Sequence, residues 1–415
     1  MPPGPENRAS ATVVGGLAQQ IRQGSRPGGE QAGFGHFLGG VDGQCYAGCL
    51  STESSMAKGK LALGLDIGST SIKMILLKEQ RKRGEVGFAL QSFGMKPLPP
   101  EAIVDGALMN STAIVQAVQE LMSELKVKGK DVAIGVSGHS VIIKKIQMPR
   151  MSQEELEESI QWEAEQYIPF DVKDVNIDTQ ILDGGGNDAT GQMDVLLVAA
   201  KKDMINDYTT VVSEAGLAPV VVDVDAFAVQ NMFSVNYDLP EKETVVLINA
   251  GASVVNINII ANGVTVFTRD VTIGGNQFTE EIQKQLNVSY EEAEALKIGG
   301  NRADADAVVP QEVERVLSSV AEQVAGEIQR SLDFYAGTAA DSNFTKVYLS
   351  GGTAKIPALF KTIEARTGVP VEILNPFRKI DVDNRKFDPA FIMDVAPMAA
   401  VAVGLALRRP GDKLA

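Results

Sequence analysis

A single carboxylate interrupts the apolar run LGLDIGSTSIKMILL, residues 63–77, at Asp66. The turn that follows consists of Gly68, Ser69 and Thr70. A glycine turn lets backbone N–H groups approach anionic oxygens closely, and the hydroxyl groups beside it add further donors. Asp66 could hold a hydrated Mg²⁺, which prefers oxygen ligands, and Lys73 could return from the next strand to a phosphate oxygen. The stretch therefore predicts a phosphate-binding hairpin.

The same pattern returns in VLINAGASVVNINII, residues 246–260. In the second copy Asn249 takes the place of Asp66, and the turn residues are Gly251, Ala252 and Ser253. A repeated unit of strand, turn and strand indicates a duplicated architecture. Two such hairpins facing each other across a cleft would hold a phosphate chain from both sides. The alternative is a pair of unrelated β-hairpins with ordinary turn residues.

Two glycine pairs stand between a predicted strand and a predicted helix. They are Gly274–Gly275 in DVTIGGNQFTEEI and Gly351–Gly352 in KVYLSGGTAKIPAL. Bare backbone at such a turn lets a base or a ribose lie near a helix N-terminus, and the alternative is close packing of the helix on the strand. Glu294 and Lys297 lie three residues apart on one helical face. They could contact ribose hydroxyls or a base edge, or they could form an ordinary solvated ion pair.

Composition excludes several classes of protein. The 415 residues suffice for two or three domains, and the net charge of −15 argues against direct binding to nucleic acid or anionic lipid. No apolar stretch reaches the roughly 20 residues that span a bilayer, and the N-terminus does not resemble a signal peptide. Cys45 and Cys49 have only His36 as a further metal ligand nearby, so the sequence does not favour a metal site there. The absence of other cysteines is typical of the cytoplasm.

Residues 1–58 are rich in Gly, Pro, Ser and Gln and have no apolar period. Such a segment cannot bury enough apolar surface to offset its ordering entropy, so we expect a disordered extension. Met56 stands shortly before the first predicted strand and offers an alternative translation start. In that case the preceding residues would be absent from the protein in the cell.

From Lys60 onward strand and helix patterns alternate, which is typical of an α/β protein. The first series has predicted strands at 61–67, 71–78, 86–93, 131–136, 141–147, 194–200 and 219–223, and helices at 111–127, 152–167, 202–215 and 225–235. The second series has strands at 244–249, 254–261, 264–270 and 346–350, and helices at 275–286, 290–298, 310–336 and 355–367. Ser152 and Glu155 form a capping box, and Asn262–Gly263 predicts a hairpin turn.

The helix that begins after Ser152 carries a tryptophan outside its apolar stripe. The stripe consists of Leu156, Ile160, Ala164 and Ile168. Trp162, the only tryptophan, points away from the stripe, and Tyr167 and Phe170 follow it. An off-stripe tryptophan is a common anchor at interfaces, which makes these three aromatic residues candidates for binding a partner. The alternative is that Trp162 packs on a neighbouring element of the same subdomain.

The order of the motifs resembles the actin-like ATPase superfamily, which includes actin, Hsp70, the sugar kinases and FtsA. The stretches QMPRMSQEELEESIQWEAEQYIPFDVKDVNIDTQIL and VFTRDVTIGGNQFTEEI resemble the PilM family of type IV pilus assembly proteins. The resemblance covers about residues 60–408. It implies a two-lobed actin-like α/β fold of duplicated ribonuclease H-like lobes, with an FtsA-like subdomain inserted into the first lobe.

The resemblance also implies where the domains begin and end. Lobe I would comprise 59–141 together with 216–242 and 395–409. The inserted subdomain would span 142–215. Lobe II would span 243–394, with a small subdomain at about 276–340.

Carried over to this chain, the resemblance implies ATP and Mg²⁺ as ligands. The nucleotide-binding residues would be Gly68, Ser69, Thr70, Lys73, Gly251, Ala252, Ser253, Gly274, Gly275, Glu294, Lys297, Gly351, Gly352 and Lys355. Asp66 would hold the metal through water, and the segment DVDAFAVQ implies Asp225 as the acid that positions the attacking water. The superfamily usually has Asp where this chain has Asn249, and a missing carboxylate weakens the hold on metal and water. We therefore expect ATP binding with slow or negligible turnover.

The implied role is a cytoplasmic scaffold that binds the short cytoplasmic tail of PilN and links the inner-membrane complex to the pilus base. Further implied features are contacts with pilus motor ATPases and a platform protein, a ring of several copies, and attachment to the inner membrane through a partner. Two other functions in the superfamily stay open. A filament-forming cytomotive protein would sediment differently with and without ATP. A small-molecule kinase would need a catalytic base beside a substrate pocket, and the sequence shows no such combination.

Overall fold

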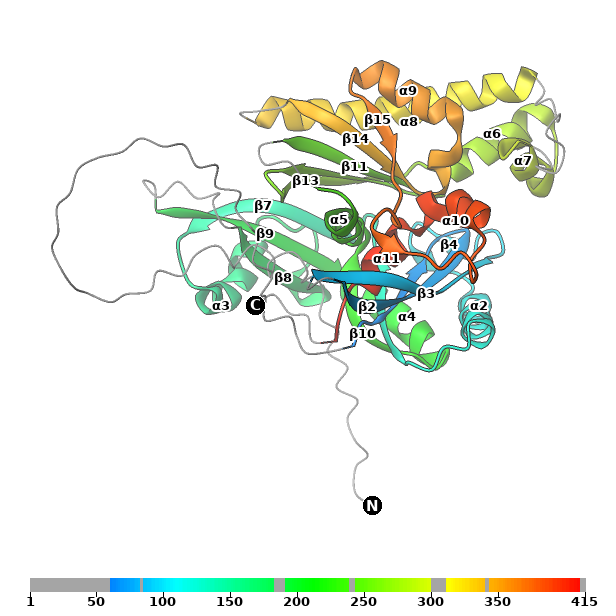
Figure 1. Ribbon diagram of the computed structural model, residues 1–415. Coiled ribbons are helices and arrows are strands. Elements are labelled where there is room, and N and C mark those ends of the chain that lie inside the picture. The colour runs from blue at the N-terminus through cyan, green and yellow to red at the C-terminus, as the bar shows by residue number, and fades with distance from the viewer. Residues whose placement is uncertain are drawn as a thin grey trace, which may run out of the picture.

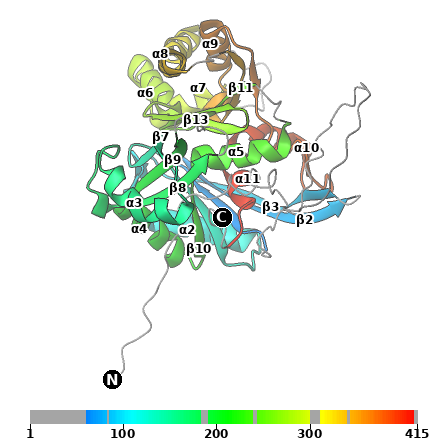
Figure 2. The same ribbon diagram turned by 90° about the vertical axis from the view of Figure 1, so that its left-hand side faces the viewer.

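The computed structural model describes residues 60–82, 85–182, 191–238, 243–299, 311–339 and 343–410. The extension 1–58, for which we expect disorder, lies outside these residues, and so do Cys45 and Cys49. The described chain forms two lobes, one above the other in Figure 1, with a smaller subdomain beside the lower lobe (Figures 1 and 2).

Lobe I, the lower lobe, is built on a six-stranded sheet of order β10-β6-β1-β2-β3-β16. Its strands are β1 (Leu63–Ile67), β2 (Ser71–Lys82), β3 (Glu85–Pro97), β6 (Asp131–Val136), β10 (Ala218–Val224) and β16 (Ile380–Asp381). β1, β2 and β3 pair antiparallel, whereas β6 runs parallel to both β1 and β10. A small hairpin and two helices complete this side of the lobe: β4 (Ile103–Val104), β5 (Ala107–Leu108), α2 (Ser111–Glu124) and α4 (Lys202–Glu214).

Lobe II repeats this topology in a five-stranded sheet of order β13-β12-β11-β14-β15. Its strands are β11 (Thr244–Ala250), β12 (Val255–Ala261), β13 (Val264–Val271), β14 (Phe344–Ser350) and β15 (Val371–Ile373). Three antiparallel strands are again followed by parallel ones. The helices are α6 (Gly275–Leu286), α7 (Tyr290–Lys297), α8 (Gln311–Thr338) and α9 (Pro357–Thr367), and α8 buries its apolar stripe on the sheet.

The duplication predicted from the two hairpins is confirmed by the strand pairing. In lobe I Asp66 lies opposite Lys73 across β1 and β2. At the same register in lobe II, Asn249 lies opposite Asn256 across β11 and β12. The two copies therefore coincide in fold and in register but differ in charge at both facing positions.

The inserted subdomain is a three-stranded sheet with one helix. It comprises β7 (Val141–Pro149), α3 (Gln153–Ala164), the 3₁₀ turn η1 (Val172–Asp174), β8 (Val175–Leu182) and β9 (Gln192–Lys201). The sheet order is β7-β9-β8, and the predicted capping box of Ser152 and Glu155 opens α3. β8 is absent from the sequence prediction. It is an edge strand with Asn176 and Asp178 among its residues, so its apolar period is weak.

Two segments pack on lobe I, although the predicted domain limits assign them to the inserted subdomain and to lobe II. α4 lies inside the span 142–215, but Ile205, Tyr208 and Val212 are buried in the core of lobe I. Residues from about 374 belong to the predicted lobe II, but β16 pairs with β3, and Phe377 packs on Phe93. Short elements such as β16 carry too few residues for a period to reveal them.

The C-terminal part of the chain runs between the lobes. It comprises α10 (Pro389–Val395), the 3₁₀ turn η3 (Ala396–Ala399) and α11 (Ala400–Ala406), and α11 crosses α5 (Asp225–Asn236) there (Figures 1 and 2). Over the described residues, Pro389–Ala406 is the one stretch long and apolar enough to span a bilayer by composition. Because 67% of it is buried inside the fold, it serves as core between the lobes.

Candidate functional site

A cavity of about 920 Å³ opens between the two lobes. Both turns of the repeat line it, one from each lobe. All the predicted catalytic and nucleotide-binding residues except Gly274 line this cavity: Asp66, Gly68, Ser69, Thr70, Lys73, Asp225, Asn249, Gly251, Ala252, Ser253, Gly275, Glu294, Lys297, Gly351, Gly352 and Lys355. The volume lies within the range of small-molecule and cofactor sites. The alternative of two unrelated hairpins is excluded, because the fold brings both turns to one cavity.

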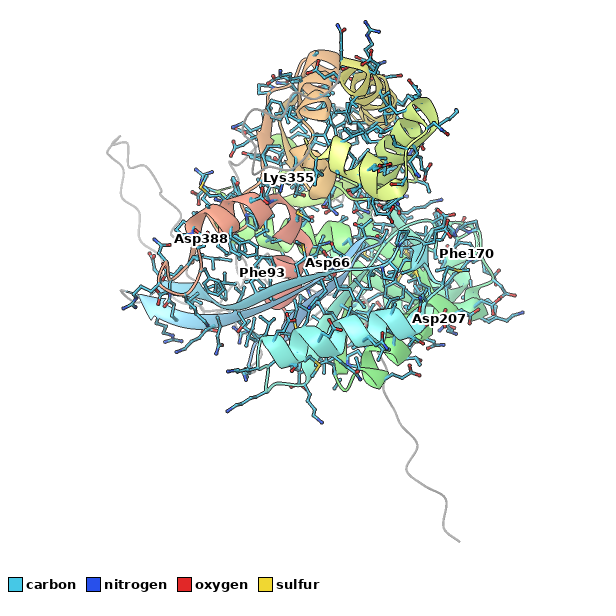
Figure 3. The ribbon with its side chains drawn as sticks, turned by 90° about the vertical axis from the view of Figure 1, so that its right-hand side faces the viewer. Asp66, Phe93, Phe170, Asp207, Lys355 and Asp388 are labelled. Atoms are coloured by element: carbon cyan, nitrogen blue, oxygen red, sulfur yellow. The ribbon has the colours of Figure 1, made fainter. Side chains whose placement is uncertain are left out.

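The first turn places an ion pair at the edge of the cavity. Asp66 is the second-to-last residue of β1, and its Oδ2 lies 3.3 Å from Lys73 Nζ on β2. Both side chains are largely buried. The N–H of Gly68 donates to the carbonyl of Ser71 at 3.2 Å, so this group closes the turn and is not free for a ligand. In Figure 3 Asp66 lies below Lys355, which comes from the upper lobe.

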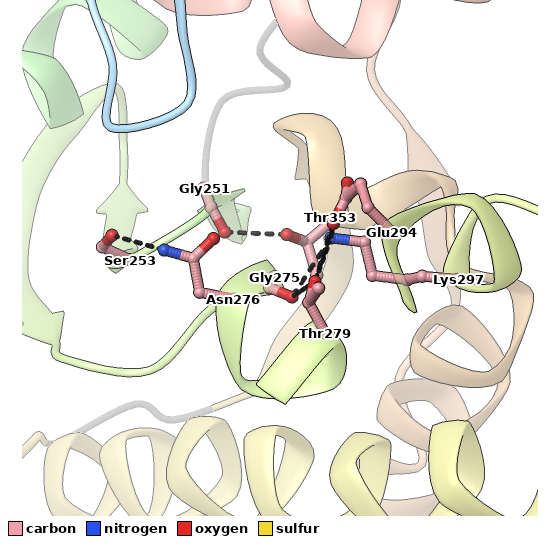
Figure 4. A network of polar contacts seen from close by, with 8 residues as sticks. All are labelled: Gly251, Ser253, Gly275, Asn276, Thr279, Glu294, Lys297 and Thr353. Atoms are coloured by element: carbon pink, nitrogen blue, oxygen red, sulfur yellow. Dashed lines mark hydrogen bonds and ion pairs between the residues drawn. The ribbon is translucent and has the colours of Figure 1, made fainter. Parts of the chain in front are cut away.

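The second turn is held by the start of α6. The N–H of Gly275 donates to the carbonyl of Gly251 at 3.0 Å, and the N–H of Asn276 donates to the carbonyl of Ala252 at 2.8 Å. The hydroxyl of Thr353 also donates to the Gly251 carbonyl, at 2.7 Å (Figure 4). Gly274 packs behind the turn, where a Cβ atom would lie 2.5 Å from the carbonyl oxygen of Ala252. Its assignment as a nucleotide contact stays a prediction, and the structure shows a packing reason for the glycine.

Glu294 and Lys297 form an ion pair, as the alternative interpretation of these residues predicted, and the Lys297 side chain is largely buried while Glu294 is partly exposed. Lys297 Nζ lies 2.6 Å from Glu294 Oε2 and donates to Thr279 Oγ1 at 2.9 Å. The Thr279 hydroxyl in turn donates to Glu294 at 2.7 Å (Figure 4). Burial lowers the pKa of the Lys297 ammonium, and the nearby Glu294 carboxylate opposes that effect. The cluster therefore presents a desolvated cation at the wall of the cavity.

The two glycines of the second pair, Gly351 and Gly352, have different roles. Gly351 has φ +91°, and a Cβ there would lie 2.2 Å from the carbonyl oxygen of Ala250, so close packing accounts for it. Gly352 lines the cavity at the start of the 3₁₀ turn η2 (Gly352–Lys355), which precedes α9. Lys355 Nζ pairs with Asp394 Oδ1 at 2.7 Å, which ties this turn to α10.

Asp225 stands at the first residue of α5 and is partly accessible from the cavity. Burial raises the pKa of its carboxyl to about 7, and the negative charge of Asp66 adds to the shift. A hydrogen bond from Ser137 opposes the shift. Gly135 makes room for this side chain, since a Cβ at that position on β6 would lie 2.2 Å from Asp225 Oδ1. Asp225 is therefore placed to exchange a proton near neutral pH.

The sequence prediction missed one wall of the cavity. The segment between β6 and β7 contributes Ser137, Gly138 and His139 to the lining. The stretch AIGVSGHSV also has the pattern of strand, glycine turn and strand, and this pattern could have revealed it. Asp270, at the end of β13, was also missed. Its carboxylate accepts the N–H of Gly138 at 2.6 Å and the amide of Asn256 at 2.8 Å, while burial raises its pKa.

The aromatic residue outside the stripe of α3 is exposed, and its role as a partner anchor stays a prediction. The four stripe residues are buried, and Trp162 is 79% exposed. The alternative, in which Trp162 packs on a neighbouring element, is wrong for this structure. Tyr167 and Phe170 are half-buried, and Lys201 Nζ lies 4.3 Å from the centre of the Phe170 ring. Figure 3 shows Phe170 on the inserted subdomain, apart from Asp66.

Comparison with known proteins yields one family. A family model described as type IV pilus assembly protein PilM matches residues 64–410. A chain of the solved PilM-PilN type IV pilus biogenesis complex is 27% identical with a TM-score of 0.73, covering 84% of this chain and 98% of that chain. Cell division protein FtsA of Streptococcus pneumoniae is 24% identical over 381 residues, which are 80% of this chain and 79% of its own length. FtsA of Neisseria meningitidis is 24% identical over 361 residues, or 74% and 84% of the two chains.

These likenesses agree with the duplicated sheets and with the inserted subdomain between β6 and β10. Together with the family match over residues 64–410, they confirm the two-lobed actin-like fold. The chain belongs to the PilM family of type IV pilus assembly proteins.

Proposed function

We propose that this protein binds magnesium–ATP between its lobes, turns it over slowly or not at all, and holds the cytoplasmic tail of a PilN-type membrane protein. The observation that carries the nucleotide part is the convergence of both turns of the repeat on one cavity. A triphosphate there would meet one turn from each lobe, so its binding would favour the arrangement in which the lobes are close together.

The residues present fit a magnesium–triphosphate group. Asp66 and Asn249 offer a carboxylate and an amide oxygen at the ends of β1 and β11. Within the described residues, no cluster of three or more His, Cys, Asp or Glu side chains is placed to hold a metal ion alone. Mg²⁺ suits such a site, since it keeps several waters and takes oxygens from the bound phosphates. When bound, it would neutralise phosphate charge, while Lys73 would contribute a second positive charge.

Slow turnover follows from the environment of Asn249. Its amide donates to Asn256 Oδ1 at 3.0 Å, and its own Oδ1 accepts the Ser350 hydroxyl at 3.4 Å. These neutral partners add no negative charge where the superfamily usually has a carboxylate. The hold on a metal-bound water is then weaker, while Asp225 remains available for a proton.

The proposal that this protein binds a PilN-type tail rests on its family and on an exposed aromatic surface. The solved relative is a PilM-PilN complex, and this chain covers 98% of the matched chain. The inserted subdomain carries the exposed Trp162 with Tyr167 and Phe170 near it. A membrane protein with a short cytoplasmic tail would bring this protein to the inner face of the inner membrane without insertion. Contacts with motor ATPases and a platform protein, and a ring of several copies, belong to the same proposal.

Calorimetric titration of magnesium–ATP into the pure protein tests the nucleotide part. We expect saturable binding that requires Mg²⁺. Lys73→Ala should weaken it about 10- to 100-fold, because a charge-assisted contact is worth roughly 1.5–3 kcal/mol. The matched control is Lys78→Ala, an exposed lysine on the same strand, which should bind like the wild type. A wild type without detectable heat, by calorimetry at two temperatures, would overturn the proposal.

A further inference from the structure

A continuous chain of polar contacts leads from the cavity to the junction with the inserted subdomain. It begins at Asn249, whose amide donates to Asn256 Oδ1 at 3.0 Å. The amide of Asn256 donates to Asp270 Oδ1 at 2.8 Å. The second oxygen of Asp270 accepts the N–H of Gly138 at 2.6 Å. Asn249, Asn256 and Gly138 all line the cavity, whereas Asp270 does not.

Asp270 sets the direction of this chain. Asp270 accepts a hydrogen bond from each neighbour, so both turn a donor toward it. Asn256 therefore points its NH₂ group at Asp270 and its carbonyl oxygen at Asn249. Asn249 therefore donates its own NH₂ group to that oxygen. Its carbonyl oxygen is left to accept from Ser350 and to face the cavity. The orientation of the Asn249 amide thus depends on an acceptor that lies two strands away.

Gly138 belongs to the first of the two connections that join the inserted subdomain to lobe I. Residues 137–140 lead from β6 into β7, and Lys201 leads from β9 into α4. The two connections touch, since the N–H of Lys201 donates to the carbonyl of Ser140 at 3.1 Å. Gly138 has φ +91°, a backbone conformation that residues other than glycine rarely adopt. A change at Gly138 is therefore well placed to turn the whole subdomain.

The Asp270–Gly138 hydrogen bond joins lobe II to this junction. Asp270 lies on β13, at the edge of the lobe II sheet, and β13 packs beside β7 (Figures 1 and 2). A movement of lobe II relative to lobe I must carry the junction along or break the bond. A ligand that engages the Asn249 oxygen stabilises one arrangement of the same chain from its other end.

We propose that Asp270 is the positioning residue through which occupation of the cavity by nucleotide controls the inserted subdomain and its affinity for the partner tail. This inference rests on the proposed function and assigns its regulation to one side chain. Asp270 need not touch the nucleotide. It acts by fixing the amides of Asn256 and Asn249 on one side and the Gly138 backbone on the other.

The test measures coupling between the two ligands. The affinity for a synthetic peptide of the PilN-type cytoplasmic tail is measured with and without magnesium–ATP. We expect magnesium–ATP to change it about 5-fold or more in the wild type, a typical coupling between sites, and less than about 2-fold in Asp270→Asn. Asp270→Asn can still accept the Gly138 N–H, but its NH₂ group opposes that of Asn256. Asp207→Asn, an exposed aspartate on α4, is the matched control and should keep the wild-type factor.

A second readout needs no peptide. Trp162 is the only tryptophan and lies on the inserted subdomain, so its fluorescence reports on that subdomain when magnesium–ATP binds. The nucleotide-induced change should be present in the wild type and lost in Asp270→Asn, although both bind nucleotide by calorimetry. Asn256→Ala breaks the same chain one step earlier and should also lose the change, which keeps the test open if Asp270→Asn does not fold.

The outcomes separate the two proposals. If the wild type binds both ligands and Asp270→Asn keeps the full coupling and fluorescence change, the role of Asp270 is overturned and the proposed function stands. The role of Asp270 is likewise overturned if the wild type binds both ligands without coupling. If the wild type binds no nucleotide, the proposed function fails first and the inference with it.

Discussion

At the residue scale, the two halves of the site share a geometry but not a charge. The positions of Asp66 and Lys73 in lobe I correspond to Asn249 and Asn256 in lobe II. An ion pair at 3.3 Å is thus replaced by a hydrogen bond between two amides at 3.0 Å. Neutral amides cost less to bury than an ion pair but attract a metal-bound water less strongly. Under the proposed function, we therefore expect the lobe II turn to bind nucleotide without promoting its hydrolysis.

Asn249→Asp tests this interpretation. We expect single-turnover hydrolysis of ATP to rise roughly tenfold, which corresponds to about 1.4 kcal/mol of transition-state stabilisation. The reason is the added negative charge beside the metal-bound water. Thermal melting verifies the fold, because the variant also loses the donor that faces Asn256. A wild type that already turns over briskly, and faster than the variant, would contradict the prediction.

Asp225 makes stability depend on pH. Its pKa is about 7 in the folded protein, so between about pH 4 and pH 7 the folded state holds a proton that the unfolded state has lost. The free energy of unfolding should therefore fall as pH rises through this range. Asp225→Asn removes the titrating group, and its stability relative to the wild type should improve by roughly 1–3 kcal/mol between pH 5 and pH 8, allowing for screening by cavity water.

Urea denaturation at pH 5 and pH 8 measures this difference. Asp131→Asn, an exposed aspartate at the start of β6, serves as the control and should follow the wild type. Equal pH dependence in the wild type and Asp225→Asn would show that the carboxyl is not held in its neutral form.

At the element scale, the crossing of α5 and α11 joins the two lobes. Gly404 on α11 lies so close to α5 that a Cβ atom would be 1.8 Å from the carbonyl oxygen of Ala228. Gly64 on β1 allows an equally close approach, because a Cβ there would be 2.2 Å from the carbonyl oxygen of Ala402. These contacts hold α11 against β1, the strand that carries Asp66. The position of the carboxylate therefore depends on small residues far away in the sequence.

Gly404→Ala should lower the free energy of unfolding by about 1–3 kcal/mol, because overpacking forces the two helices apart. Gly337→Ala is the matched control on α8, where a Cβ would meet nothing within 4 Å. This variant should gain roughly 0.5–1 kcal/mol, since alanine loses less backbone entropy in a helix. Chemical denaturation of both variants measures these changes in the free energy of unfolding. Equal stability for the two would mean that the helix crossing tolerates a wider separation.

At the scale of the whole molecule, the nucleotide and the partner are assigned to different places. The cavity lies between the lobes, whereas Trp162 lies on the inserted subdomain (Figure 3 labels Phe170 there). Under the proposed function, this separation would let a bound nucleotide report the state of the lobes without competing with the tail for one site. The exposed tryptophan is the part of that surface most readily tested.

Trp162→Ala should weaken binding of the PilN-type tail peptide at least about tenfold, since buried tryptophan anchors at interfaces are often worth about 2 kcal/mol or more. Its affinity for magnesium–ATP should not change. Phe334→Ala, which removes an exposed aromatic residue from α8 in lobe II, is the matched control. Fluorescence anisotropy of a labelled peptide measures the peptide affinity of the wild type and of both variants. An unchanged peptide affinity with an intact fold would remove Trp162 from the interface.

The sequence by itself determined the duplicated hairpins, the α/β order of elements and a set of site residues of which all but Gly274 line the cavity. It could do so because each turn is local: a strand, a glycine and a few polar residues reveal themselves within about 15 positions. The capping box of α3 and its apolar stripe are local in the same way. The superfamily resemblance followed from the order of these local units along the chain, and the family resemblance followed from two longer stretches of sequence.

Tertiary structure decided what depends on contacts between distant segments. The sequence left open whether Gly274 and Gly351 contact a ligand or allow close packing, because the backbones they approach come from other elements. Nor could it place Asp270 against Gly138, 132 positions away, and so it missed the chain of polar contacts. The charge of Asp225 depends on burial, which arises only when the lobes fold together. Local patterns thus specify the parts of this site, and packing between the lobes specifies how the parts act on one another.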